Sequence, residues 1–198
     1  MSLVELARPE IQQLHAYAAA EQVADTIRLN ANESPPLGTG DQFRRPLNRY
    51  PEVRPQRLQV ARAKRFGCQT AQLLGTRGSS EAIDLHVRSF CRAGQDSVLT
   101  TAPTLSMYRH YAAIQGAEVI EEPTSAAQDF ALDTEALIAA CQPDTRLVFV
   151  CSPNNPTGAT LAAGQLERLL EARSKQSAVV VDEAYIEFAD TPSSIALL

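Results

Sequence analysis

Cysteine is scarce and widely spaced in this sequence of 198 residues. The four cysteines include no CxxC pair; they are Cys68, Cys91, Cys141 and Cys151. Disulfide frameworks and structural zinc sites usually need cysteines that are numerous or paired at short spacing. The distribution therefore predicts reduced, packed thiols in a cytoplasmic protein and no metal site.

Long apolar runs and an excess of basic residues are also absent. No stretch approaches the apolar length of a membrane span. The first 22 residues carry Glu5, Arg8 and Glu10 among their apolar positions, unlike a secretory signal peptide. The net charge is -5 and the isoelectric point is about 5.2, which argues against a nucleic-acid partner. We expect a soluble cytoplasmic protein without a membrane or nucleic-acid partner.

What the sequence does contain is a regular alternation of strand and helix patterns. The hydrophobic fraction of 44% is ordinary for a folded domain with a substantial core. The patterns predict strands at residues 97–101, 118–121, 146–151 and 178–182, and helices at 58–66, 81–90, 105–115, 134–141 and 161–173. Short β-branched strands separated by helices predict an α/β fold, a mostly parallel sheet with helices on both faces.

Side chains that face the core can be predicted for three helical stretches. In the helix at 81–90 the apolar stripe is Ile83, Val87 and Phe90, and in the helix at 161–173 it is Leu166, Leu169 and Leu170. The chain up to about residue 28 has the pattern of an amphipathic helix or arm, with Leu6, Ile11, Leu14 and Tyr17 as its apolar positions.

Four polar strings stand where strands end or a helix begins. They are TRGSSE at 76–81, PTLSMY at 103–108, SPNNPTG at 152–158 and DEAY at 182–185. In parallel sheets, ligands bind beyond the carboxyl ends of the strands. A helix amino terminus suits a phosphate, an aromatic side chain suits a flat ring, and a carboxylate suits a protonated ring nitrogen. Taken singly, three of the strings also have an ordinary reading, as a helix cap, a turn or a core aromatic, whereas SPNNPTG is too specific to arise from turn chemistry alone. Together they predict a site for pyridoxal 5′-phosphate (PLP).

The same strings carry a family resemblance. LNANESP, NRYPE, TRGSSEAID, PTLSMY, VCSPNNPTG and VVVDEAYIEF occur in this order along nearly the whole chain. The sequence resembles fold-type I PLP-dependent aminotransferases, and within them the histidinol-phosphate aminotransferases. The resemblance implies an enzyme that exchanges an amino group between histidinol phosphate and 2-oxoglutarate/glutamate in histidine biosynthesis. Threonine-phosphate decarboxylases share these strings, so a PLP enzyme of that kind stays open.

The resemblance also implies a domain plan and an assembly. Residues 1–40 would be an N-terminal arm that contributes to the small domain and the substrate site. Residues 41–198 would be the first part of the PLP-binding large domain, with the C-terminal half of the family absent. The family's site is formed by a homodimer, in which Tyr50 would reach the phosphate of the neighbouring subunit's cofactor.

Each remaining site residue is a carry-over from the family's motifs. The amides of Ser79 and Ser80 would hold the cofactor phosphate, and Tyr108 would stack on the pyridine ring. Asp182 would pair with the ring nitrogen, while Asn155 and Tyr185 would bond the ring hydroxyl; in the arm, Tyr17 and Asn32 would lie near the substrate.

The sequence departs from the family at three places. The family commonly has Tyr-Gly where this chain has Leu105 and Ser106, which would loosen the site modestly. It often has Asp at Ser80, a change that a backbone phosphate contact tolerates. Most seriously, the lysine that forms the Schiff base lies in a motif beyond Leu198.

The chain holds only two lysines, and neither suits catalysis. Lys64 lies on an early charged helix, and Lys175 precedes the strand at 178–182, at the end of the sheet opposite Asp182. We therefore expect a cofactor cradle without its catalyst. One hypothesis is the N-terminal portion of an aminotransferase; the other is a non-catalytic remnant that binds the cofactor or a partner chain noncovalently.

Overall fold

The computed structural model describes residues 3–15, 17, 26–27, 29, 31–34 and 48–197. The chain divides into two compact units, a larger one of residues 1–14 and 76–197 and a smaller one of residues 15–75. The predicted boundary at residue 40 falls outside the described residues. The predicted site residues of the strand ends all belong to the larger unit.

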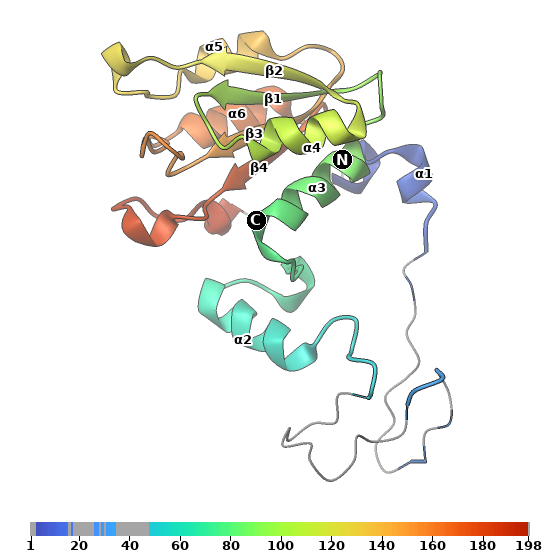
Figure 1. Ribbon diagram of the computed structural model, residues 1–198. Coiled ribbons are helices and arrows are strands. Elements are labelled where there is room, and N and C mark those ends of the chain that lie inside the picture. Colours follow the sequence, from blue (N-terminus) through green and yellow to red (C-terminus); the bar gives the residue numbers. More distant parts are fainter. Residues whose placement is uncertain are drawn as a thin grey trace. The chain divides into compact units, whose positions relative to one another are not determined.

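A four-stranded parallel sheet is the centre of the larger unit (Figure 1). Its strands are β1 (Ser97–Ala102), β2 (Glu118–Pro123), β3 (Thr145–Cys151) and β4 (Ala178–Asp182). Their order across the sheet is β2-β1-β3-β4, and every neighbouring pair is parallel. Since Cys151 is the register partner of Asp182, the carboxyl ends of β3 and β4 lie level at the same edge. The predicted parallel sheet is confirmed.

Helices cover both faces of this sheet, as predicted (Figure 1). The helices α3 (Gly78–Phe90) and α4 (Met107–Gln115) pack on one face, and α5 (Thr134–Ala140) and α6 (Gln165–Arg173) on the other. Successive residues of a strand point to opposite faces. In β3, Leu147 and Phe149 therefore join the core under α3 and α4, whereas Val148 and Val150 join the core under α5 and α6. This explains why the strand is apolar at almost every position.

Two predictions about α6 need correction. The helix begins at Gln165 rather than at residue 161, because Gly164 has a left-handed backbone with φ of 81° and cannot continue a helix. Leu166 and Leu169 are buried, but Leu170 is 40% exposed. One residue corresponds to about 100° around a helix, so Leu170 lies beside the stripe rather than in it. In α3, by contrast, Ile83 and Val87 are buried as predicted and Phe90 packs against them.

The N-terminal segment of the larger unit is less helical than predicted. It contains a 3₁₀ turn, η1 (Leu3–Leu6), and one short helix, α1 (Pro9–Gln12). Leu14 is largely exposed, as is Tyr17 of the smaller unit, so they do not form the predicted apolar stripe. Much of the stretch from 16 to 30 lies outside the described residues. The Arg8 amide donates to the Ser89 carbonyl over 2.9 Å, which fastens this segment to the end of α3.

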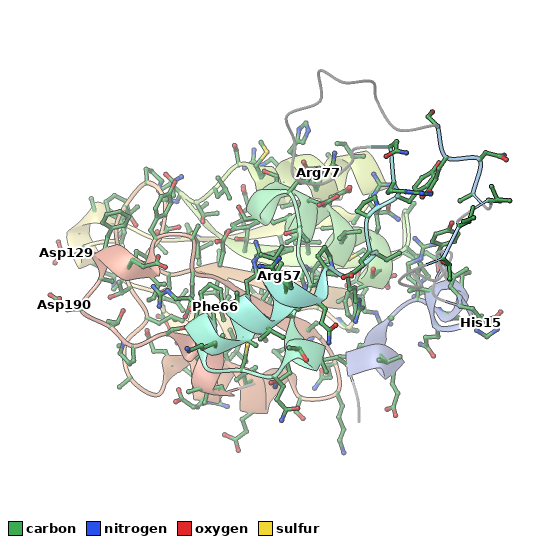
Figure 2. All side chains as sticks on the ribbon, turned by 90° about the horizontal axis from the view of Figure 1, so that it is seen from below. His15, Arg57, Phe66, Arg77, Asp129 and Asp190 are labelled. Carbon is green, nitrogen blue, oxygen red and sulfur yellow. The ribbon has the colours of Figure 1, made fainter. Side chains whose placement is uncertain are left out.

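The smaller unit contains the helix α2 (Gln56–Phe66), whose two ends are marked by Arg57 and Phe66 in Figure 2. It ends at Gly67, which has φ of 69°, so the predicted glycine stop is confirmed. The remaining 3₁₀ turns of the described chain are η2 (Thr70–Gln72), η3 (Ala126–Gln128), η4 (Ile186–Phe188) and η5 (Ser194–Leu197).

The four cysteines are free thiols, as predicted. Cys91 and Cys151 are buried, and burial raises the pKa of the Cys91 thiol to about 12. Among the described residues, no three His, Cys, Asp or Glu side chains are grouped so that they could hold a metal ion. The described helices also include none with the length and apolar character needed to cross a membrane.

Candidate functional site

Asp182 is the last residue of β4 and the centre of the candidate site. One carboxylate oxygen, Oδ2, accepts a hydrogen bond of 2.9 Å from the Tyr108 hydroxyl, and the other, Oδ1, accepts one of 3.1 Å from the Ala184 amide. The carboxylate is thus held from two sides while the residue remains half-buried at the edge of the sheet. A carboxylate in this setting suits a cationic group that approaches the carboxyl ends of the strands.

Tyr108 belongs to the first turn of α4. Its side chain is completely buried, and its ring stacks on Phe149 of β3 with ring centroids 4.8 Å apart and an interplanar angle of 12°. The ring is enclosed between α4 and the sheet, which does not favour the predicted stacking of Tyr108 on the pyridine ring. The position where the resembled family commonly has a tyrosine is Leu105, half-buried in the loop before α4.

The SPNNPTG segment leaves β3 as a tightly bonded turn organised by Asn154. The Asn154 amide group donates to the Pro103 carbonyl over 3.0 Å and to the Thr157 hydroxyl over 2.8 Å. Its Oδ1 accepts from the Thr104 hydroxyl over 2.7 Å. The bonds to Pro103 and Thr104 join the loop after β3 to the loop after β1, so both loops hold one fixed arrangement at the same edge. The peptide bonds before Pro103, Pro153 and Pro156 are cis.

Asn154 was not among the predicted site residues. The available signal was its place inside the SPNNPTG string, next to the predicted Asn155. Its role depends on Pro103 and Thr104, which are about 50 residues away along the chain. No local pattern shows that pairing.

Asn155 and Tyr185 lie at the same edge as Asp182, because they follow β3 and β4 directly. Asn155 is half-buried within the SPNNPTG turn. Tyr185 precedes the 3₁₀ turn η4 and is 46% exposed, so its side chain is accessible to a ligand. The next residue after Asp182, Glu183, faces other partners: its carboxylate accepts hydrogen bonds from Ser193 and Ser194.

Ser79 and Ser80 occupy the first turn of α3. No side chain caps this helix, and the first amides of a helix have no partner within it. Because α3 leads into a strand of a parallel sheet on which it packs, its amino end lies toward the carboxyl ends of the strands (Figure 1). The two serines are exposed there, and their amides can serve an anion.

Arg77 and Glu81 form an ion pair at this helix start, and Figure 2 shows Arg77 beside α3. The Arg77 amide and guanidinium both donate to the Glu81 carboxylate, which lowers the pKa of Glu81 below its usual value. The pair fixes the loop at the entrance to α3 and adds a cation near the free amides.

Three predicted residues belong to the smaller unit and are described within it. Tyr50 and Tyr17 are 61% and 81% exposed. The Tyr50 amide donates to the Glu33 carboxylate over 2.9 Å, and Arg49 pairs with the same carboxylate over 2.6 Å. Asn32 is exposed and has a left-handed backbone with φ of 49°. Their predicted contacts with a cofactor or substrate remain predictions.

Neither lysine lies in the candidate site of the larger unit. Lys175 stands three residues before β4, in a pocket of about 230 Å³ that also contains Arg8, Arg92 and Arg146. That pocket is at the amino ends of the strands, whereas Asp182 terminates β4 at the carboxyl end. Lys64 is on α2 of the smaller unit.

The sequence profile of a family described as aminotransferase class I and II matches residues 17–198. The chain belongs to this family. A histidinol-phosphate aminotransferase of Xylella fastidiosa (strain 9a5c) is 42% identical over 201 residues, which covers 100% of this chain and 55% of that relative.

Solved aminotransferase structures show the same fold. The histidinol-phosphate aminotransferase of Sinorhizobium meliloti, solved in complex with pyridoxal-5′-phosphate, has a TM-score of 0.65 and 26% identity, covering 71% of this chain and 38% of that one. The aromatic aminotransferase of Pyrococcus horikoshii OT3 has a TM-score of 0.56 and 30% identity, covering 61% and 33%. This aminotransferase chain spans about 55% of the length of the curated relatives that it matches.

Proposed function

We propose that these residues form the cofactor-binding part of a PLP-dependent aminotransferase that acts on histidinol phosphate and 2-oxoglutarate/glutamate. The observation that carries the proposal is the 42% identity with a histidinol-phosphate aminotransferase across the whole chain. The donor set at the strand ends fits the cofactor: a held carboxylate, an uncapped helix start, an amide side chain and a phenol lie in one unit. The whole protein would act in histidine biosynthesis and would be located in the cytoplasm.

Each group at this edge has a task that its chemistry supports. The amides of Ser79 and Ser80 would bind the phosphate at the start of α3. Asp182 would hold the proton on the pyridine nitrogen, and Asn155 and Tyr185 would hydrogen-bond the ring hydroxyl. When bound, PLP supplies an electron-withdrawing ring for the substrate's α-carbon. The chain's share of that chemistry is to keep the ring nitrogen protonated and the ring in place.

The residues of the smaller unit would complete the site in an assembly. Tyr50 would contact the phosphate of a second copy's cofactor in a homodimer, and Tyr17 and Asn32 would approach the substrate. The two tyrosines are exposed, which leaves their side chains accessible for these tasks. Tyr50→Phe should weaken cofactor binding, relative to the unmodified chain, at concentrations where the chain is dimeric. At concentrations where it is monomeric, both chains should bind the cofactor equally well.

PLP binding by the purified chain tests the cofactor proposal. We expect saturable noncovalent binding, seen as quenched tyrosine fluorescence and a shifted cofactor absorbance. After reduction with borohydride, intact mass should show no stoichiometric adduct, because Lys175 stands at the opposite end of the sheet and Lys64 belongs to the other unit. A chain that binds no PLP would overturn the proposal; a single adduct at Lys175 would show that a different site carries the cofactor.

The substrate proposal needs the part of the relatives that this chain does not span. We would join the chain to the C-terminal remainder of the Xylella relative and measure glutamate formed from histidinol phosphate and 2-oxoglutarate. The borohydride adduct of this chimera reports whether the cofactor site has formed. An adduct with release of carbon dioxide from threonine phosphate, and no amino transfer, would favour the decarboxylase alternative instead.

The non-catalytic alternative has one observation in its favour. Within the larger unit the only lysine, Lys175, is at the wrong end of the sheet for the proposed site. The chain alone could bind PLP without forming an adduct and show no activity. That result agrees both with a non-catalytic remnant and with the cofactor-binding part of an enzyme. An active chimera would decide for the enzyme.

A further inference from the structure

A buried tyrosine and the candidate site's carboxylate meet in the larger unit although 74 residues separate them. Tyr108 comes from the first turn of α4, and Asp182 comes from the end of β4. Phe149 of β3 stacks against the tyrosine ring, which prevents the ring from turning away. The hydroxyl is therefore fixed in direction as well as in position.

The Tyr108 hydroxyl acts as a donor. Burial, and next the charge of Asp182, raise the pKa of the Tyr108 phenol far above its ordinary value. The raised pKa favours the protonated phenol, which is the form that can donate to Asp182. Its hydrogen bond to Oδ2 runs from the tyrosine hydroxyl to the carboxylate.

The two carboxylate oxygens of Asp182 accept hydrogen bonds from different donors. Oδ2 is held by Tyr108 from the core side, and Oδ1 accepts the Ala184 amide next to β4. A carboxylate oxygen has lone pairs beyond one hydrogen bond. The remaining lone pairs of the Asp182 carboxylate are available to a ligand at the carboxyl end of β4. The bonds from Tyr108 and Ala184 fix the plane of the carboxylate.

We propose that Tyr108 is a positioning residue, which orients the Asp182 carboxylate toward the cofactor's ring nitrogen through its buried hydroxyl. Phe149 supports it by holding the tyrosine ring. The inference rests on the proposed function, since Asp182 would serve as the partner of that nitrogen. In this role Tyr108 contacts Asp182, which would contact the cofactor, instead of stacking on the cofactor itself as predicted from the sequence.

A double-mutant cycle in the chain without cofactor tests the link itself. Tyr108→Phe keeps the stacked ring and removes only the hydroxyl. We expect this change to lower the equilibrium constant for folding about tenfold, as for hydrogen bonds to charged groups. In the Asp182→Ala background the same change should be neutral or stabilising, because the hydroxyl there has lost its acceptor. Equal effects in both backgrounds, measured by urea unfolding, would overturn the proposal.

A matched control is Tyr111→Phe on the same helix. The Tyr111 ring lies edge-on to His110 with centroids 5.4 Å apart, and it belongs to no part of the proposed site. It controls for the general effect of losing a tyrosine hydroxyl from α4. We expect the change in folding stability caused by Asp182→Ala to be the same with Tyr111→Phe as without it.

Titration with PLP tests the positioning role. Tyr108→Phe should weaken PLP binding about tenfold relative to Tyr111→Phe, and it should shift the absorbance of bound PLP toward the form with an unprotonated ring nitrogen. If the unmodified chain binds no PLP, the proposed function fails while the mutant cycle still decides the Tyr108–Asp182 link. If the chain binds PLP and Asp182→Ala abolishes binding, but Tyr108→Phe binds with unchanged affinity and spectrum, the positioning role is overturned.

Discussion

Asp182 and Glu183 are neighbours in sequence with different tasks in the structure. Asp182 is held by Tyr108 and faces the strand edge, whereas Glu183 accepts hydrogen bonds from the Ser193 hydroxyl and from the amide and hydroxyl of Ser194. At the scale of single residues, this division separates the proposed partner of the cofactor from the anchor of the last residues of the described chain.

We expect Asp182→Ala to abolish detectable PLP affinity, because the ring nitrogen loses its anionic partner. Glu183→Ala should keep that affinity and instead loosen the segment that contains η5, which is seen as faster proteolysis near residue 194. A PLP titration compares the two variants. Equal losses of affinity would contradict the assignment of Asp182 as the nitrogen's partner.

A second residue, Asp96, is important for stability rather than for the site. It is 2% exposed and accepts hydrogen bonds from the Arg92 amide, the Arg92 guanidinium and the Arg146 guanidinium. Burial opposes its ionisation, but the bonds from the two arginines outweigh burial and lower the pKa of Asp96 from 3.8 to about 2. The charged form is therefore bound more tightly in the folded chain than in the unfolded one.

This shift predicts how stability changes with pH. Because the folded pKa is the lower one, the contribution is fully present above a pH of about 4 and is lost as the pH falls toward 2. We expect a loss of about 2 kcal/mol in the free energy of unfolding over this range, and a smaller loss in Asp96→Asn. Urea unfolding at several pH values measures it, with the surface-pair variant Asp84→Asn as control. An unchanged pH profile in Asp96→Asn would contradict the prediction.

At the scale of elements, the two loops after β1 and β3 behave as one bonded structure. Asn154 connects them through two side-chain hydrogen bonds, to Pro103 and Thr104. A third, to Thr157, and the bond of 2.8 Å from its backbone amide to the Ala159 carbonyl hold the loop after β3 itself. This explains why so polar a segment follows a buried strand: the polar groups satisfy one another, and the turn presents Asn155 in a fixed position.

Replacing Asn154 by alanine should therefore destabilise the chain by about 2 kcal/mol, since the Thr104 hydroxyl and the Pro103 carbonyl lose their partner. Asn155→Ala, which keeps these bonds, should cost less than about 0.5 kcal/mol while weakening PLP binding. Urea unfolding and PLP titration of both variants separate the two roles. Equal destabilisation by the neighbouring substitutions would show that Asn154 has no special part in the turn.

Element boundaries were predicted best where a local residue enforces them. The ends of α2 and α4 coincide with Gly67 and Gly116, which have φ of 69° and 74°. Helix starts were predicted less well: α3 begins at Gly78 instead of residue 81, and α4 begins at Met107 instead of residue 105. No side-chain cap marks either start, so the sequence carried no signal for it.

At the scale of the whole molecule, β4 is an edge strand. Within the described part of the chain it pairs only with β3, and apolar side chains after it are exposed, with Phe188 at 88%, Leu197 at 50% and Tyr185 at 46%. An open edge beside exposed apolar side chains is a surface that other chains can bind.

The isolated chain should therefore associate in solution and bind a hydrophobic dye. Sedimentation velocity over a range of concentrations measures the association. Phe188→Lys should reduce both effects with little change in the folded structure, because this side chain has few contacts to lose. A single monomeric species without dye binding would contradict the prediction.

Local patterns in the sequence were sufficient to predict the strands, most helices, the parallel sheet and the family, since hydrophobic period, turn residues and motif strings are all short-range properties. The partners of Tyr108 and Asn154 could not be predicted in this way. They depend on the strand order β2-β1-β3-β4, which brings α4 and the loop after β1 next to the ends of β3 and β4. A motif shows that a tyrosine belongs near the site, but only packing in three dimensions shows whether its ring faces the ligand or its hydroxyl supports the residue that does.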